Sequence, residues 1–288
     1  MKVVILIVIY NKEVRDSSTF RTLILNGVHD LHIVIHNNGP EIIYLPPEIV
    51  SELELLNVTI TLNNCIQNMP LACLYNEFID FYADYDKFVL LDDDSTLTTS
   101  YMNSLYNNDY DIELPKIVSV VDGKTYYPIS RDLVCINDDY LDPSTTISIG
   151  SGIIITRSFL EKFSKKGLKI FDEKYAFYGV DSSLFRRMWK LKREGQDFRI
   201  KSSSTIIHSL SRTEGPESIF RKNERLMDFA ITMRHYPSFS GYLSLLKKGL
   251  KQLVTLKMKD FILMFRCFFS GIHPRSKIWS DSKRRQSK

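Results

Sequence analysis

The sequence lacks closely spaced cysteines, long apolar runs, internal repeats and low-complexity linkers, and these absences exclude several classes of protein. Without a CxxC or other close pair, the four cysteines predict reduced thiols in a cytosolic compartment; they are Cys65, Cys73, Cys135 and Cys267. A transmembrane helix is not expected, because Arg266 interrupts the apolar run at Phe261–Phe269. With 288 residues, 44% of them apolar, the chain can form one large domain or a domain with an appendage.

The apolar start of the chain, Met1–Ile9, predicts a buried strand rather than a signal peptide. It is short and rich in β-branched residues, and Tyr10-Asn11-Lys12-Glu13 follows it in place of a small-residue cleavage site.

Basic charge is concentrated near the C-terminus. The net charge is +4, but residues 243–288 carry twelve Lys or Arg and two Asp, so this segment contributes +10 and the remainder −6. Two stretches in it have apolar residues at helical spacing, and lysines accompany the first. Both stretches predict amphipathic helices, which suit an anionic membrane surface better than a nucleic-acid duplex. Packing on the main domain or on another subunit is the alternative. The apolar positions are Leu243, Leu246, Leu250 and Leu253, then Met258, Phe261, Ile262, Phe265 and Phe269.

Strand and helix patterns alternate through the first half of the chain. Helices are expected over Ser17–Leu25 and after Pro70, between four strands at Val3–Ile9, Leu31–Ile35, Val58–Leu62 and Phe88–Leu91. Such units predict an α/β fold with an open, mostly parallel sheet flanked by helices. The second half predicts a hairpin at 117–127, a strand at Thr145–Thr156, a helix at Asp181–Lys192 and a strand at Thr205–Ile207.

Polar residues gather at the predicted carboxyl ends of three strands, which is where open α/β sheets bind ligands. They are Tyr10-Asn11, His36-Asn37-Asn38 and Asp92-Asp93-Asp94. Three adjacent carboxylates repel one another, and hard divalent cations such as Mg²⁺ prefer oxygen ligands, so Asp92–Asp94 predicts a metal–diphosphate site. A solvated turn with an Asp cap on the following helix is the alternative.

Several motifs together resemble a known family. The first strand with Tyr10-Asn11-Lys12 resembles a nucleotide-binding start, and Leu90-Leu91-Asp92-Asp93-Asp94-Ser95 resembles an Asp-x-Asp motif. Ile149-Gly150-Ser151-Gly152 resembles an acceptor-side strand. Phe171-Asp172-Glu173, Tyr178-Gly179-Val180-Asp181 and Leu184-Phe185-Arg186-Arg187 resemble the base segment, and His208-Ser209-Leu210 resembles a late His motif. The order and spacing of these motifs, over residues 3 to 212, resemble family-2 glycosyltransferases of the GT-A fold. The similarity extends to the rhamnosyltransferase-like enzymes of bacterial O-antigen and capsule synthesis.

The resemblance implies inverting transfer of a hexosyl or deoxyhexosyl group from a UDP- or dTDP-sugar, with Mg²⁺ or Mn²⁺ at the diphosphate. Asp94 would be a metal ligand, with Asp92 and Asp93 on the ribose, a metal-bound water or the metal itself. His208 would complete the metal shell or contact the diphosphate; a locally hydrogen-bonded histidine is the alternative. Asp181 would be the catalytic base, with a plain helix cap as its alternative.

Further donor contacts are implied at Tyr10 and Asn11, which could stack on and bond the base, and at Asn37 and Asn76. A packed aromatic residue is the alternative for Tyr10, and a polar surface residue is the alternative for Asn76. Arg212 could contact phosphate.

The sequence departs from the family pattern at two positions. His36 stands where the family commonly has Asp, and Val180 precedes Asp181 where the family often has a second acid.

The resemblance also implies a domain division and a location. Residues 1–238 would form the GT-A domain, with a nucleotide-binding half at 1–96 and an acceptor half at 97–238, and residues 239–288 a basic helical tail. The acceptor would be a saccharide on a polyprenyl diphosphate, which places the protein in the cytoplasm, peripherally on the inner face of the cell membrane. No nucleic-acid partner is expected.

Two other classes fit less well. A sugar-phosphate nucleotidyltransferase usually begins with a Gly-rich, Arg-containing loop, which Ile9-Tyr10-Asn11-Lys12 is not. A non-catalytic carbohydrate-binding relative would have no need to keep both Asp92–Asp94 and Asp181.

Overall fold

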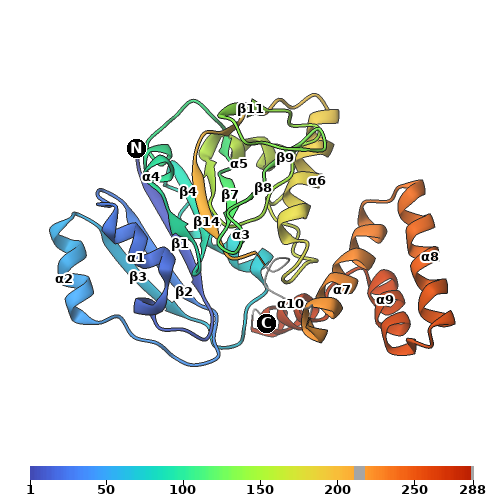
Figure 1. Ribbon diagram of the computed structural model, residues 1–288. Coiled ribbons are helices and arrows are strands. Elements are labelled where there is room, and N and C mark those ends of the chain that lie inside the picture. The colour runs from blue at the N-terminus through green and yellow to red at the C-terminus, as the bar shows by residue number, and fades with distance from the viewer. Residues whose placement is uncertain (211–217, 287–288) are drawn as a thin grey trace. The chain divides into compact units, whose positions relative to one another are not determined.

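The computed structural model describes residues 1–210 and 218–286, which form two compact units interleaved along the chain (Figure 1). Unit 1 contains residues 1–68, 77–170 and 187–210, and unit 2 contains residues 69–76, 171–186 and 218–286. Unit 2 combines segments from both sides of residue 238, so the two units do not test the predicted domain boundary there. That boundary stays a prediction.

Unit 1 is built around a parallel four-stranded arrangement, as its sequence predicts. Strands β1 (Val3–Ile9), β2 (His32–Asn37), β3 (Thr59–Asn64) and β4 (Lys87–Asp92) lie in the order β4-β1-β2-β3. The apolar run of β1 is buried because β1 pairs with β2 on one side and β4 on the other.

Four short strands extend this sheet to eight beyond β4. Strand β12 (Ile153–Thr156) runs antiparallel between β4 and β6 (Ile112–Glu113), followed by β13 (Ile200–Ser202) and β11 (Asp139–Leu141). The prediction of a mostly parallel α/β sheet is confirmed.

The strand expected over Thr145–Thr156 is wrong in its first part. The backbone N–H groups of Thr145 and Thr146 both donate to the Asp142 carbonyl, which closes a turn instead of extending a strand. Gly152 has a φ of +86°, and a Cβ there would lie 2.7 Å from the Pro115 ring. The Ser and Gly residues before β12 therefore form an irregular loop against the sheet.

Helices flank the sheet at the places where the chain crosses between strands. Ser17 caps α1 (Ser18–Leu25) by accepting a hydrogen bond from the Phe20 N–H. The expected helices correspond to α1, α3 (Leu71–Phe81) and α6 (Val180–Arg193), whereas α2 (Pro47–Leu55), α4 (Thr99–Ser104), α5 (Arg157–Ser164) and the 3₁₀ turn Val14–Asp16 were not expected.

A second, smaller sheet determines where His208 lies. Its strands follow the order β5 (Thr96–Leu97), β14 (Thr205–His208), β7 (Lys116–Ser119) and β8 (Thr125–Tyr127), and β7 with β8 forms the expected hairpin. Strand β5 follows directly on the Asp92–Asp94 turn, and it pairs antiparallel with β14. This pairing brings the end of β14 back to the aspartates. A two-stranded ribbon, β9 (Ile129–Ser130) and β10 (Leu133–Val134), completes unit 1.

Unit 2 contains the C-terminal helices α7 (Ile219–His235), α8 (Phe239–Val254), α9 (Met258–Ser270) and α10 (Pro274–Gln286). Leu226 and Ile231 on α7 and Met264 and Cys267 on α9 are buried in it. The two amphipathic stretches of the tail correspond to α8 and α9. Within the described residues, no helix combines the length and the apolarity needed to cross a membrane.

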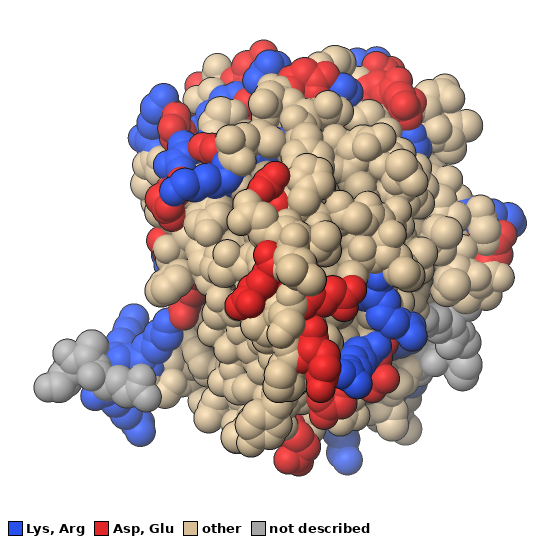
Figure 2. Space-filling view, turned by 90° about the vertical axis from the view of Figure 1, so that its left-hand side faces the viewer, with Lys and Arg blue, Asp and Glu red and all other residues tan. Residues whose placement is uncertain are grey.

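Charged side chains on the face shown in Figure 2 form small groups of both signs, with uncharged areas between them.

Candidate metal centre

Asp92, Asp94 and His208 converge at the carboxyl end of β4. One ligand atom of each residue lies within 4.8 Å of the other two. His208 Nδ1 is 3.2 Å from Asp94 Oδ1, and His208 Nε2 is 3.9 Å from Asp92 Oδ2. The structure therefore brings together the three residues predicted as metal ligands.

Two serines hold the histidine and the strand end in place. Ser95 Oγ lies 3.0 Å from His208 Nδ1 and 3.0 Å from Ser151 Oγ, and the Asp92 N–H donates to Ser151 Oγ (3.1 Å). His208 Nδ1 therefore has both Ser95 Oγ and Asp94 Oδ1 beside it, and Nε2 faces Asp92. The sequence analysis included both serines in motifs but gave neither a role, because their contact depends on β12 pairing with β4.

The start of α1 binds the backbone of the aspartate turn. Thr19 Oγ1 donates to the Asp92 carbonyl (2.5 Å) and accepts from the Ser95 N–H (2.9 Å). Ser17 Oγ donates to the Asp93 carbonyl (3.0 Å). These bonds fix the backbone of the turn that carries the three carboxylates.

The electrostatics of the turn favour a cation. Burial raises the pKa of the Asp94 carboxyl, and repulsion from Asp93 adds to that rise against the attraction of His208. Asp94 Oδ1 is buried and accepts no hydrogen bond. A buried carboxylate oxygen that accepts no hydrogen bond and lies 3.2 Å from His208 Nδ1 fits a divalent ion, which would compensate the charge of the turn.

Asp93 lies outside this cluster of ligand atoms. Its Oδ1 accepts from Lys12 Nζ at 3.0 Å, and both side chains are partly buried. The third aspartate is thus neutralised by a lysine, and Lys12 is a site residue whose pairing sequence reasoning missed.

The predicted donor residues Tyr10, Asn11 and Asn37 lie at the ends of β1 and β2. Tyr10 is 52% exposed, unlike the packed aromatic residue considered as its alternative. The Asn11 N–H donates to the Gly39 carbonyl (2.7 Å). Asn37 is buried, donating to the Glu41 carbonyl and accepting from the Gly39 N–H, so its side chain orders this loop. Their contacts with a donor stay predictions.

His36, near the end of β2, stands where the family commonly has Asp, and its surroundings determine its charge. Burial lowers the pKa of its imidazole to about 4, and its Nε2 is buried without a hydrogen-bond partner. The residue is therefore neutral at physiological pH and brings no charge to the end of β2.

Unit 2 contains the predicted base and one predicted donor residue. Asp181 lies in the first turn of α6, and its role as base stays a prediction. Asn76 is buried rather than on the surface: its amide donates to the Phe171 carbonyl (2.9 Å) and to Glu173 Oε1 (3.2 Å). Arg212 lies outside the described residues.

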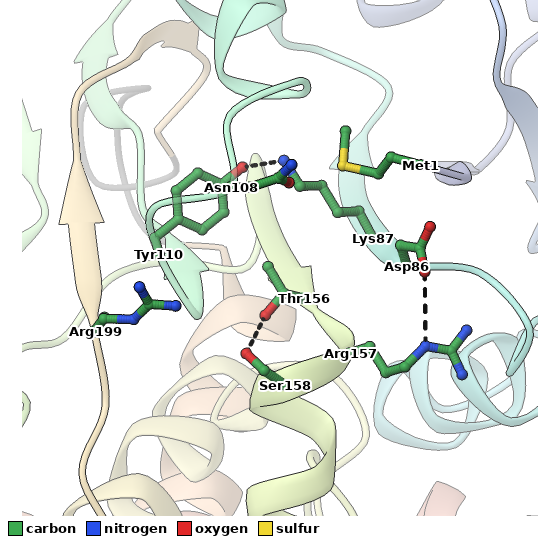
Figure 3. A pocket seen from close by; sticks show the side chains of 9 residues that line it. All are labelled: Met1, Asp86, Lys87, Asn108, Tyr110, Thr156, Arg157, Ser158 and Arg199. Carbon is green, nitrogen blue, oxygen red and sulfur yellow. Dashed lines mark hydrogen bonds and ion pairs between the residues drawn. The ribbon is translucent and has the colours of Figure 1, made fainter.

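A cavity of about 390 Å³ lies at the opposite, amino end of β4 (Figure 3). Its buried cation, Lys87, donates to the Leu105 carbonyl and the Tyr110 hydroxyl, and burial lowers its pKa to about 8. Arg157 and Arg199 in the cavity wall face Asp86 and Asp111 respectively. Since this cavity lies at the end of β4 opposite to Asp92–Asp94, it is separate from the predicted ligand site.

Comparisons with known proteins identify the fold. No protein-family model and no curated protein matches the sequence. Solved structures do: S. aureus TarS 1–349 superposes with a TM-score of 0.53 at 11% identity, over 94% of this chain and 91% of that chain. The same protein in complex with UDP-GlcNAc gives 0.55 at 12% identity, over 96% and 83%. These structures share a GT-A-like α/β fold with this chain, an open, mostly parallel sheet flanked by helices. At these identities, the likeness is one of architecture.

Proposed function

We propose that this protein is a metal-dependent glycosyltransferase that moves a sugar from a nucleotide-sugar donor to a saccharide acceptor. One observation carries the proposal: Asp92, Asp94 and His208 converge at the carboxyl end of β4 in a fold shared with TarS, which has been solved with UDP-GlcNAc. Ligands of open α/β sheets bind at this edge.

Asp92, Asp94 and His208 would hold Mg²⁺ or Mn²⁺. When bound, the ion stabilises the negative charge that develops on the diphosphate as the sugar leaves. Lys12, paired with Asp93, keeps one carboxylate of the turn from repelling the diphosphate.

The donor in this proposal is a UDP- or dTDP-sugar. The exposed ring of Tyr10 is free to stack on a nucleotide base, and Asn11 follows it at the same strand end. Asn37 and Asn76 are hydrogen-bonded within the protein, so they would shape the donor site through the loops they hold.

The transfer is a single displacement. The acceptor hydroxyl oxygen forms a bond to the anomeric carbon, the bond from that carbon to the diphosphate oxygen breaks, and the hydroxyl proton passes to the Asp181 carboxylate. With no protein nucleophile, the anomeric configuration inverts. A carboxylate as general base fits this step.

The resemblance to O-antigen and capsule enzymes supports a role in bacterial surface polysaccharide synthesis. The acceptor would be a saccharide on polyprenyl diphosphate. Such an acceptor is met at the cytoplasmic face of the cell membrane, where we place the protein as a peripheral component.

Incubation with radiolabelled UDP- and dTDP-sugars, Mn²⁺ and extracted lipid-linked saccharides tests the proposal. A glycosyltransferase moves label into the lipid fraction, and EDTA stops the transfer. In a parallel incubation, conversion of a labelled sugar phosphate and a nucleoside triphosphate to a nucleotide sugar and pyrophosphate would indicate a nucleotidyltransferase. Donor binding without transfer to any acceptor would indicate a binding protein.

A further inference from the structure

Helix α8 has one face fixed against its neighbours in unit 2. Gly241 and Gly249 allow close approach: a Cβ on Gly241 would lie 2.7 Å from Met233 Sδ on α7, and one on Gly249 would lie 3.1 Å from the Phe265 ring on α9. Leu245, between these glycines, is buried. These contacts show which face of α8 packs against α7 and α9, and therefore which face points away from these two helices.

The outward side of α8 and the turn after it are apolar and exposed. Leu250 and Leu256 are 62% and 83% exposed. Leu256 has a φ of +55°, a conformation that usually selects Gly or Asn, so a large apolar residue at this turn has no local structural advantage. We name as the α8 surface Phe239, Leu243, Leu246, Leu250, Leu253 and Leu256.

The charge around the α8 surface has one sign. Residues 239–259 contain five lysines and no acidic residue. Lys247 and Lys251 are exposed beside the leucines of α8, and Lys257 follows the turn. Asp260, the first acid after this stretch, is paired with Lys222 of α7.

We propose that the α8 surface inserts into the interface of an anionic lipid bilayer, with the flanking lysines on the headgroups. Exposed leucines next to exposed lysines are complementary to this partner, the leucines to its apolar interior and the lysines to its anionic headgroups. A second copy of the chain fits less well, because a symmetric contact would place lysines against lysines. A nucleic acid would leave the leucines without a partner.

Sedimentation with vesicles of phosphatidylcholine, alone or mixed with phosphatidylglycerol, tests the surface with the full-length protein. We expect binding to the anionic vesicles only, weakening as salt rises. Leu250→Ser with Leu256→Asn should weaken it at least about tenfold, because two exposed side chains lose their burial in lipid. Asn suits the φ of residue 256, so the fold should be retained. Leu25→Ser with Leu55→Asn, at exposed leucines of unit 1, is the matched control and should bind like the wild type.

Lys247→Glu with Lys251→Glu should likewise weaken binding about tenfold or more. Lys165→Glu with Lys277→Glu changes the net charge equally at exposed lysines elsewhere and should have a much smaller effect. Absence of vesicle binding by the wild type, or binding that survives the leucine changes, would overturn the proposal. Self-association that the same leucine changes abolish would assign the surface to a second copy. The choice of a cellular membrane as partner rests on the proposed function, but the vesicles carry neither donor nor acceptor, so failure of either proposal is recognised separately.

Discussion

At the scale of single residues, the candidate metal centre depends on side chains that would not bind the metal themselves. Ser95 contacts both His208 Nδ1 and Ser151, and Thr19 fixes the backbone of the aspartate turn. Such supporting bonds orient ligands and set their affinity for the ion.

Ser95→Ala should lower the affinity for Mn²⁺ by about 10–100-fold, because His208 loses the bond that orients its ring. Ser18→Ala, at the start of α1, is a matched control: Ser18 Oγ makes only a long contact of 3.4 Å to the Asp93 carbonyl. Mn²⁺ titrations followed by electron paramagnetic resonance would measure both variants. Equal affinity for the ion in wild type and Ser95→Ala would remove Ser95 from the site.

Asp181→Asn should leave donor and Mn²⁺ affinity nearly unchanged and reduce the rate of sugar transfer by at least about 100-fold, since the amide cannot take the acceptor's proton. Single-turnover transfer at saturating donor measures this. A variant that transfers at the wild-type rate would make Asp181 a structural residue of the α6 start, and Glu173 would be the next acid to test.

At the scale of elements, the strands were the most predictable part of the structure. The uninterrupted apolar run Val3–Ile9 corresponds to β1, and Ser17 caps α1 where the sequence places its start. Hydrophobic periodicity predicts that a strand forms, but it does not predict which residues of two neighbouring strands lie opposite each other. Asn37 donates to Asn64 because the pairing of β2 with β3 places these two residues opposite each other. The sequence of either strand alone does not determine that pairing. Helix α7 was missed because no motif of the resemblance reaches it.

Helix α7 also contributes Asp228, which packs against the segment before α6. A Cβ on Gly179, whose φ is +82°, would lie 2.0 Å from Asp228 Oδ1, so only glycine fits there. Burial raises the pKa of Asp228 to about 6. Between pH 4 and 6 the folded state thus binds this proton more tightly than the unfolded state, and the free energy of unfolding falls as pH rises through that range.

Asp228→Asn should therefore stabilise the protein by about 1–3 kcal/mol at pH 7.5 and change its stability little at pH 4.5. Urea unfolding at both pH values measures the difference, and the comparison between variant and wild type cancels the other titrating groups. The same change in stability at both pH values would show that the ionisation of Asp228 costs nothing in the folded state.

At the scale of the whole molecule, the sequence predicted the architecture, and it named the three residues that the structure brings together at the end of β4, because the resemblance joins motifs that are far apart in the chain. The prediction could not extend to the two interleaved units. Segment 171–186 belongs to the same unit as the C-terminal helices, and the Tyr175 hydroxyl is hydrogen-bonded to the Thr232 hydroxyl of α7 (3.1 Å). Local sequence patterns do not predict such a long-range contact.

The central claim is that a nucleotide diphosphate binds through a divalent ion held by Asp92, Asp94 and His208. Isothermal titration of UDP and dTDP into the protein, with Mn²⁺ or with EDTA, tests it most directly. We predict binding that requires Mn²⁺ and weakens at least about tenfold in Asp94→Asn, whereas Asp132→Asn, at an exposed loop carboxylate with a φ that Asn adopts, binds like the wild type. Nucleotide binding that is equally tight in EDTA, or unchanged in Asp94→Asn, would contradict the account.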